Sequence, residues 1–262
     1  MVAIQYMSDL HLERIKYDYG ISKATPFLIL DGDIGRFCDY DLLKDFLATQ
    51  CDKFEKVLYV PGNHEFYSSS REGGLVAADS LVKEPSMNAR LYVMNRERID
   101  LPDSNATVLG CTLHSQIPPD YTRLTRDFEQ IKGWRVAHHN AEHQRDLAWL
   151  KLSLAELSQE SPKRNVVIAT HYAPSFDKVC HPQHKNNAVQ PCFSSHTLEQ
   201  LPSWKGSGLV THWIFGHTHW NAKFKAGKVT VASNQLCNDS HQLSWWQKRS
   251  YHPFDPEATI VV

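Results

Sequence analysis

The sequence predicts an α/β fold. Two observations support this prediction: short apolar runs that suit strands buried on both faces, and helical patterns that lie between some of these runs. The chain has 262 residues, of which 42% are hydrophobic and 22% charged, an ordinary globular composition. This composition excludes a mainly disordered chain, a collagen and a coiled coil. Because α/β folds often extend past about 200 residues as one domain, we expect a single domain over residues 1–262.

The predicted strands are short apolar runs that end abruptly in polar residues. They cover residues 2–7, 27–30, 57–60, 107–113, 165–169 and 213–215. Continuous apolar runs of this kind are typical of strands covered on both faces, as in an α/β sandwich. Further along the chain, residues 223–233 predict a hairpin with Gly227 in its middle, and residues 258–262 predict a last strand.

Two segments carry helical patterns and two others carry none. Residues 41–51 place apolar side chains at helical spacing, and residues 143–157 form a broader apolar stripe. Residues 117–134 and 179–190 are irregular. Since irregular loops on a rigid scaffold often carry function, both are candidate active-site loops or lids.

The charge balance and the cysteines limit the classes of partner and location. Lys and Arg total 28 against 29 Asp and Glu, a net charge of −1, which makes a nucleic-acid partner held by bulk charge improbable. No secretory signal and no membrane-spanning run is predicted. The six cysteines are scattered without a CxxC pair, so we expect reduced thiols and a cytoplasmic protein. The oligomeric state cannot be inferred from this composition.

Polar residues that can bind metal ions follow several of the predicted strands. They are Asp9, His11, Asp33, Asn63, His64, His171, His217 and His219. In open α/β sheets, ligands bind at the carboxyl ends of strands, so we expect these side chains to meet at one rim. A mixture of imidazole nitrogens with carboxylate and amide oxygens suits Mn²⁺, Fe²⁺ or Fe³⁺, or Zn²⁺. The set is too large for one tetrahedral ion and sufficient for two ions that share one carboxylate.

At these residues the sequence resembles the calcineurin-like metallophosphoesterases. The matching motifs are Asp9-Leu10-His11, Gly32-Asp33, Gly62-Asn63-His64-Glu65, His171 and Gly216-His217-Thr218-His219. The sequence around these motifs is most similar to that of small cytoplasmic predicted phosphoesterases of bacteria and fungi. The resemblance implies a four-layer α/β/β/α sandwich of two mixed sheets flanked by helices, with a dinuclear metal site at the strand ends.

The resemblance also implies a role for each motif residue. The ligands of the two divalent ions would be Asp9, His11 and His219 for one, Asn63, His171 and His217 for the other, and Asp33 as a bridge. A metal-bridging hydroxide would attack the phosphorus of a small soluble phosphodiester or phosphomonoester, with a nucleotide among the candidates. His64 would protonate the leaving oxygen, with Asp33 as the carboxylate that keeps its ring charged. For Glu65 we expect a structural role.

Three alternative functions remain open. A protein Ser/Thr phosphatase is one, although those enzymes carry a Gly-Asp-x-x-Asp-Arg-Gly run. Here the second Asp is missing and Arg36 falls one residue early. A recombination-repair nuclease shares the metal motifs but has additional DNA-capping segments. A non-catalytic metal-binding scaffold on the same fold is the third alternative.

Several residues outside the motifs are weaker candidates. Asn140, His143 and Arg36 could contact substrate or orient a metal-bound histidine. A zinc site at Cys180, His181, His184 and Cys192 is disfavoured by the spacing, so we expect a plain loop there. The pair Trp245-Trp246, followed by Lys248-Arg249, could stack on a base, but core packing is the favoured interpretation.

Overall fold

The computed structural model describes residues 1–237 and 251–262, and it contains two mixed β-sheets. The first sheet has the order β11-β1-β2-β3-β4, in which only β11 is antiparallel to its neighbour. Its strands are β1 (Ala3–Met7), β2 (Phe27–Asp31), β3 (Lys56–Val60), β4 (Leu91–Val93) and β11 (Thr259–Val261). The expectation for Trp245-Trp246 and Lys248-Arg249 falls outside the described residues.

The second sheet has the order β5-β6-β7-β8-β10-β9 and is parallel except at its two edges. Its strands are β5 (Glu97–Asp100), β6 (Ala106–Cys111), β7 (Asn165–Thr170), β8 (Val210–Phe215), β9 (Lys223–Ala226) and β10 (Val229–Ala232). The last two form the predicted hairpin, whose turn contains Gly227 with φ 59°.

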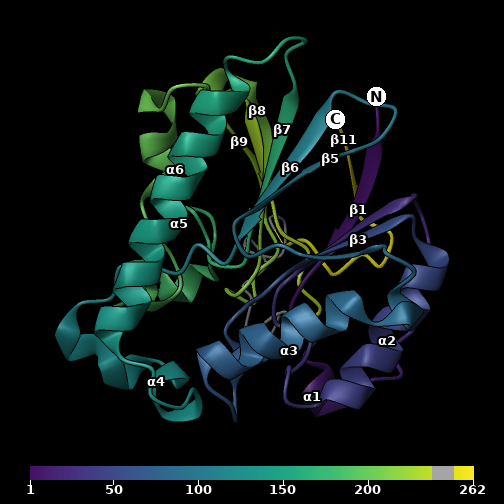
Figure 1. Ribbon diagram of the computed structural model, residues 1–262. Helices are drawn as coiled ribbons and strands as arrows, with labels where there is room; N and C mark the ends of the chain where they lie inside the picture. Colours follow the sequence, from purple (N-terminus) through teal and green to yellow (C-terminus); the bar gives the residue numbers. More distant parts are fainter. Residues whose placement is uncertain (238–250) are drawn as a thin grey trace.

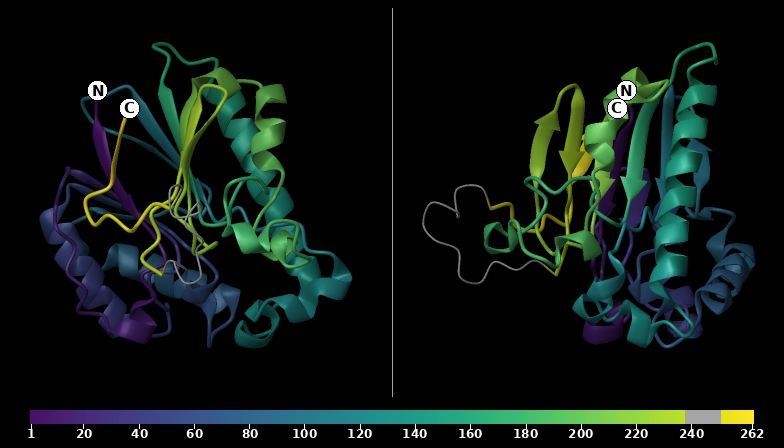
Figure 2. Two further views of the ribbon diagram at one scale, coloured as in Figure 1. Left: turned by 180° about the vertical axis from the view of Figure 1, so that it is seen from behind. Right: turned by 90° about the vertical axis from the view of Figure 1, so that its left-hand side faces the viewer.

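Helices cover the outer faces of the two sheets, so the molecule has four layers (Figures 1 and 2). The helices α1 (Leu12–Ile15), α2 (Tyr40–Lys53) and α3 (Arg71–Lys83) lie beside the first sheet, and α5 (Val136–Leu157) and α6 (Thr197–Gln200) lie beside the second. The short helix α4 (Asp127–Gln130) lies below α5 in Figure 1. The predicted arrangement of two mixed sheets flanked by helices is confirmed.

The apolar side chains of the strands alternate between two cores. In β2, Leu28 and Leu30 pack against the helices, whereas Phe27 and Ile29 pack between the sheets. Each strand is therefore apolar on both faces, which explains its uninterrupted apolar run. A third core joins α5 to the second sheet. No helix among residues 1–237 and 251–262 is long and apolar enough to cross a membrane.

Two of the longer helices differ from the sequence expectation, and the short helices α1, α4 and α6 were not expected. Helix α5 begins at Val136, seven residues before the expected start, because its first turns bury polar side chains such as His139 and Glu142 instead of apolar ones. Helix α3 was not expected. Its buried residues are Gly74, Ala78 and Leu81, of which two are small, and a Cβ atom at Gly74 would lie 2.5 Å from the ring of Phe66. Small buried residues give little hydrophobic periodicity, so the sequence pattern did not reveal this helix.

The start of α3 provides a test of local stability. The Ser70 hydroxyl accepts a hydrogen bond from the Gly73 amide at 3.0 Å and so caps the helix. Ser70→Ala removes this acceptor, and we expect it to lower the free energy of unfolding by about 1 kcal/mol. Urea unfolding measures the change, and Ser70→Asp, which keeps an acceptor, serves as the control. Equal losses in both variants would contradict a capping role.

Candidate metal centre

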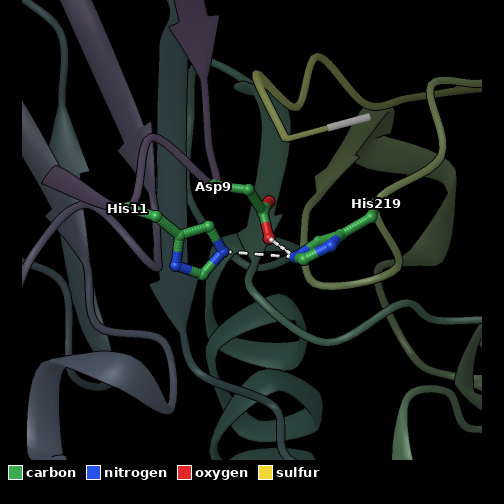
Figure 3. Close-up of side chains that lie close together, drawn as sticks. All are labelled: Asp9, His11 and His219. Atoms are coloured by element: carbon green, nitrogen blue, oxygen red, sulfur yellow. Dashed lines mark hydrogen bonds and ion pairs between the residues drawn. The ribbon is translucent and has the colours of Figure 1, made fainter. Parts of the chain in front are cut away.

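One group of potential metal ligands lies where β1 and β8 end. Asp9, His11 and His219 point toward one another (Figure 3). The Nε2 atoms of His11 and His219 lie 3.2 Å apart, and His219 Nε2 lies 3.4 Å from Asp9 Oδ1. Asp9 and His11 are fully buried, and His219 is partly exposed. Two imidazole nitrogens and a carboxylate that converge in this way are suited to bind a divalent cation.

A second group of potential ligands lies next to the first, and its member Asp33 also lies close to His11 of the first group. It consists of Asp33, His171 and His217. Asp33 Oδ1 lies 3.3 Å from His171 Nε2, and Asp33 Oδ2 lies 3.9 Å from His11 Nε2. The Oδ2 atom is buried and has no hydrogen-bond partner, as expected of an atom that binds a metal ion. Asp33 therefore faces both groups, in the position that a bridging carboxylate requires.

Hydrogen bonds on the far side of the rings fix which nitrogen faces the centre. His171 Nδ1 donates to the backbone oxygen of Asp31 at 3.0 Å, and His11 Nδ1 donates to Glu13 Oε1 at 3.2 Å. Both Nε2 atoms are then left to face the centre as lone-pair donors. Asp33 and the other nearby carboxylates outweigh the effect of burial and raise the pKa of His171 to about 10. A metal cation in place of the His171 proton would be bound by the same nitrogen and oxygen atoms.

The amide of Asn63 is oriented in the same way. Its Nδ2 atom donates to Asp127 Oδ1 at 2.8 Å and to the Tyr67 hydroxyl at 3.1 Å. Its Oδ1 atom consequently faces His171 Nε2, at 3.2 Å. An amide oxygen is the atom that binds hard cations, so Asn63 fits the second ligand group. The donor sets of both groups therefore fit two divalent ions.

Backbone strain marks the same positions. Five residues of this centre, none of them glycine, have left-handed φ angles: Asp9 54°, His11 48°, Asp33 52°, His217 69° and His219 50°. Such conformations cost of order 1–3 kcal/mol each and persist where the surroundings enforce them. Gly62 is required because a Cβ atom there would lie 2.4 Å from Asp33 Oδ1. Strained backbone of this kind clusters at functional sites.

Glu65 holds the loops together without facing the centre. Its carboxylate accepts hydrogen bonds from the backbone amides of Asp33, Ile34 and Gly62 at 3.1, 2.8 and 2.7 Å. It also accepts one from the Tyr59 hydroxyl at 2.7 Å. Burial raises its pKa to about 7. These bonds agree with the structural role expected for Glu65.

His64 lies beside the two ligand groups. Its Nδ1 atom donates to Glu13 Oε1 at 2.9 Å, and its ring stacks on Tyr67 with centroids 4.1 Å apart. Burial alone would lower the pKa of His64, but the Asp33 and Glu13 carboxylates outweigh it and raise the pKa. The sequence analysis named Asp33 as the carboxylate partner, whereas Glu13 makes the hydrogen bond and Asp33 Oδ2 lies 4.0 Å from Nε2.

Glu13 and Asp127 are thus two residues that sequence reasoning missed. Glu13 is buried between two histidines, and their hydrogen bonds and charges outweigh its burial and lower its pKa to about 2. Its place two residues after His11 was the only signal. Asp127 lies in the irregular segment 117–134, and nothing in the sequence pairs it with Asn63.

A cavity of about 350 Å³ opens onto this centre. Its lining includes Asp33, Asn63, His64, His217 and His219, together with Arg14, Arg36, Arg126 and Phe193. The irregular segment 117–134 contributes to the wall, as the sequence suggested for a candidate loop.

Two of the weaker candidates lie elsewhere. Asn140 bonds the backbone of Ile117 through both side-chain atoms, at 2.8 and 2.9 Å, and His143 donates to the Leu113 oxygen at 2.8 Å. Both are on α5, hold the chain after β6, and are not part of the cavity lining. In the described part of the chain, the clusters with metal-ligand geometry are the two groups above and a third of His11, Asp33 and His64. None of them includes Cys180, His181, His184 or Cys192.

Comparison with known proteins agrees with this arrangement. The family model of the calcineurin-like phosphoesterases matches residues 6–221. The chain is similar to uncharacterized protein L509 of Acanthamoeba polyphaga mimivirus, with 26% identity over 286 residues that cover 97% of this chain and 98% of that one. The fold is similar to the crystal structure of Phosphopantetheinyl Hydrolase (PptH) from Mycobacterium tuberculosis, with a TM-score of 0.62, 16% identity, and 90% and 89% of the chains covered. The chain therefore belongs to the calcineurin-like phosphoesterase family.

Proposed function

We propose that the protein is a metal-dependent phosphoesterase that hydrolyses a small phosphorylated substrate. The observation that supports it best is the position of Asp33, whose carboxylate faces two separate groups of buried ligands. One ion would be held by Asp9, His11 and His219 and the other by Asn63, His171 and His217. The mixed nitrogen and oxygen donors suit Mn²⁺, Fe²⁺ or Fe³⁺, or Zn²⁺.

The protein side chains supply the remaining requirements of the reaction. Two bound divalent cations supply positive charge to the phosphate oxygens and acidify a water molecule. His64 would protonate the leaving oxygen, and the bond from its Nδ1 atom to Glu13 supports this role because it leaves Nε2 as the nitrogen that would carry the transferred proton. Tyr67 stacks on the ring and restricts its rotation. The cavity volume lies at the lower end of the range of small-molecule sites, which favours a small substrate.

Turnover of bis-p-nitrophenyl phosphate and p-nitrophenyl phosphate tests this function. We expect hydrolysis with Mn²⁺, loss of hydrolysis in EDTA, and recovery when Mn²⁺ is restored. Asp33→Asn should lower kcat/KM by at least about a hundredfold, since even residues that only orient metal ligands contribute 10–100-fold. Asp177→Asn, an exposed carboxylate outside this cavity, is the matched control.

Two results would contradict the proposal. Full activity in EDTA or in Asp33→Asn would exclude a role for the metal ions. Folded protein that binds two metal ions but hydrolyses no phosphoester would favour the non-catalytic scaffold instead. Metal content is measured on the same samples by inductively coupled plasma mass spectrometry.

A further inference from the structure

Two neighbouring hollows share lining residues with the cavity at the metal centre. One, of about 380 Å³, shares Phe193, His217 and His219 with the cavity. The other, of about 590 Å³, shares Glu13, Arg14 and Arg36 with it. The first group follows β7 and β8 of the second sheet, whereas the second group follows β1 and β2 of the first sheet. We refer to the cavity and these two hollows together as a trough, with the proposed phosphate site between the hollows.

A trough of this form indicates the number of organic groups on the phosphate. A phosphomonoester has one ester arm and would leave one hollow without contacts. A phosphodiester has two arms and can place one in each hollow. The arrangement therefore favours a diester, which the sequence left undecided.

The two hollows differ in chemistry. The hollow on the β8 side is lined by Val189, Phe193 and four histidines, and the Phe193 ring stacks on His217 with centroids 4.7 Å apart. This side suits an apolar or aromatic group. The junction on the other side carries two guanidinium groups, so it suits an anion.

Arg36 is held in a fixed orientation at that junction. Its Nε and Nη2 atoms donate to the two oxygens of Asp39, both at 2.9 Å. Tyr17 fixes this pair, since its hydroxyl donates to Asp39 at 2.8 Å and accepts from the Arg36 amide at 3.0 Å. The Nη1 atom takes no part in the ion pair and lies 3.4 Å from the hydroxyl of Ser68, which lines the metal cavity. A guanidinium held in this way loses little entropy when it binds an anion.

Arg14 adds a second, exposed cation. Its side chain is 55% exposed, and its Nε atom lies 3.7 Å from Glu13 Oε1. That oxygen already accepts hydrogen bonds from His11 and His64, so Glu13 compensates the charge of Arg14 only in part. Asp18 and Asp45 line the same hollow, but neither lines the junction. Asp39 balances the charge of Arg36, so the excess of positive charge at the junction comes from Arg14, whose partner Glu13 is shared with His11 and His64.

We propose that the substrate is a phosphodiester with one apolar or aromatic arm, bound at Phe193, and one arm that carries a second anionic group, bound by Arg36 and Arg14. This inference rests on the proposed function. The second anion is a phosphate or a carboxylate, and it is distinct from the phosphate that is cleaved.

Two nucleotide diesters that differ in one phosphate test the proposal. They are thymidine 5′-(p-nitrophenyl phosphate) and its 3′-phosphorylated form. In both, hydrolysis consumes one water, breaks the bond from phosphorus to the p-nitrophenyl oxygen, and releases p-nitrophenolate. With Mn²⁺-loaded protein we expect the 3′-phosphate to raise kcat/KM about tenfold or more, through a lower KM.

Variants of Arg36 and Arg14 test whether these two side chains cause the rise in kcat/KM. In Arg36→Gln and in Arg14→Gln the ratio of the kcat/KM values of the phosphorylated and unphosphorylated diesters should fall to about twofold or less. Arg14→Gln alters an exposed side chain, so it tests the proposal even if Arg36→Gln disturbs Asp39 and folds poorly. Arg123→Gln is the control, because this exposed arginine is close in sequence to Arg126 but does not line the cavity.

Each contrary result has a distinct meaning. No gain from the 3′-phosphate, or an undiminished gain in both variants, would overturn the anion site. More efficient hydrolysis of p-nitrophenyl phosphate than of both diesters would overturn the preference for two arms. If no compound is hydrolysed, the proposed function fails, and calorimetry then tests the anion site independently of turnover. Tighter binding of thymidine 3′,5′-bisphosphate than of thymidine 5′-phosphate, lost in Arg36→Gln, would support it, and equal affinities would overturn it.

Discussion

Glu13→Gln should lower the turnover of a phosphodiester with a poor leaving group by about a hundredfold or more. A positioned general acid contributes about 10²–10⁴-fold, and Glu13 is the carboxylate that holds His64 through Nδ1. The glutamine can still accept this hydrogen bond, but it cannot stabilise the positive charge of the imidazolium. His64→Ala, which removes the acid itself, sets the upper limit of the effect.

A series of aryl phosphodiesters with leaving groups of increasing pKa measures this prediction. Good leaving groups need no proton, so the loss in Glu13→Gln should be small for p-nitrophenyl esters and should grow along the series, as in His64→Ala. Glu84→Gln, a glutamate remote from the centre that bonds Tyr40, is the control. Glu13 also bonds His11, so metal content is measured as well. A uniform loss along the series with loss of metal would show that Glu13 acts through His11 alone.

Asp127→Asn should weaken metal binding at one of the two sites by about 10–100-fold. The Asp127 carboxylate accepts from the Asn63 amide and the Tyr67 hydroxyl, both at 2.8 Å, and from the Tyr172 hydroxyl at 3.0 Å. An asparagine offers only one acceptor oxygen to these three donors, and that oxygen is uncharged. The hydrogen bond that turns the Asn63 oxygen toward His171 is therefore weaker or lost.

Calorimetric titration of the metal-free protein with Mn²⁺ measures this effect. We expect one of two binding steps to weaken, with the other unchanged, because Asp9, His11 and His219 do not contact Asp127. Tyr67→Phe removes one neighbouring hydroxyl and should have a smaller effect, and Glu129→Gln, exposed on the same short helix, is the control. Two unchanged binding steps in Asp127→Asn, in protein that is folded by circular dichroism, would show that Asn63 is oriented without this carboxylate.

The metal ligands were predictable because each lies close in sequence to a recognisable apolar strand. Each predicted ligand directly follows a buried apolar run, and parallel strands bring such ends to one edge of a sheet. The partners that orient these ligands were not predictable. Asp127 lies 64 residues from Asn63, and Glu13 lies 51 residues from His64. Contacts over such separations depend on how loops pack, and a single sequence contains no pattern for them.

Polar residues on the buried face of α5 show a related limit. Asn140 and His143 have the side-chain chemistry of binding residues, and the sequence cannot show which groups surround them. In the structure their hydrogen-bonding atoms meet the backbone of the chain after β6, whose amide and carbonyl groups need partners once buried. A polar residue inside a helix is therefore weak evidence for a binding site, whereas a polar residue at the carboxyl end of a buried strand is stronger evidence.

The ligand groups draw on both sheets. Asp9, His11, Asp33 and Asn63 follow strands of the first sheet, and His171, His217 and His219 follow strands of the second. Each proposed ion would therefore cross-link the sheets, in addition to the apolar core that they share and the hydrogen bonds between their loops. An ion that binds only the folded chain adds about 2.7 kcal/mol of stability at a concentration 100 times its dissociation constant. By thermodynamic linkage, the supply of metal in the surroundings would then govern how much of the protein persists in its folded form.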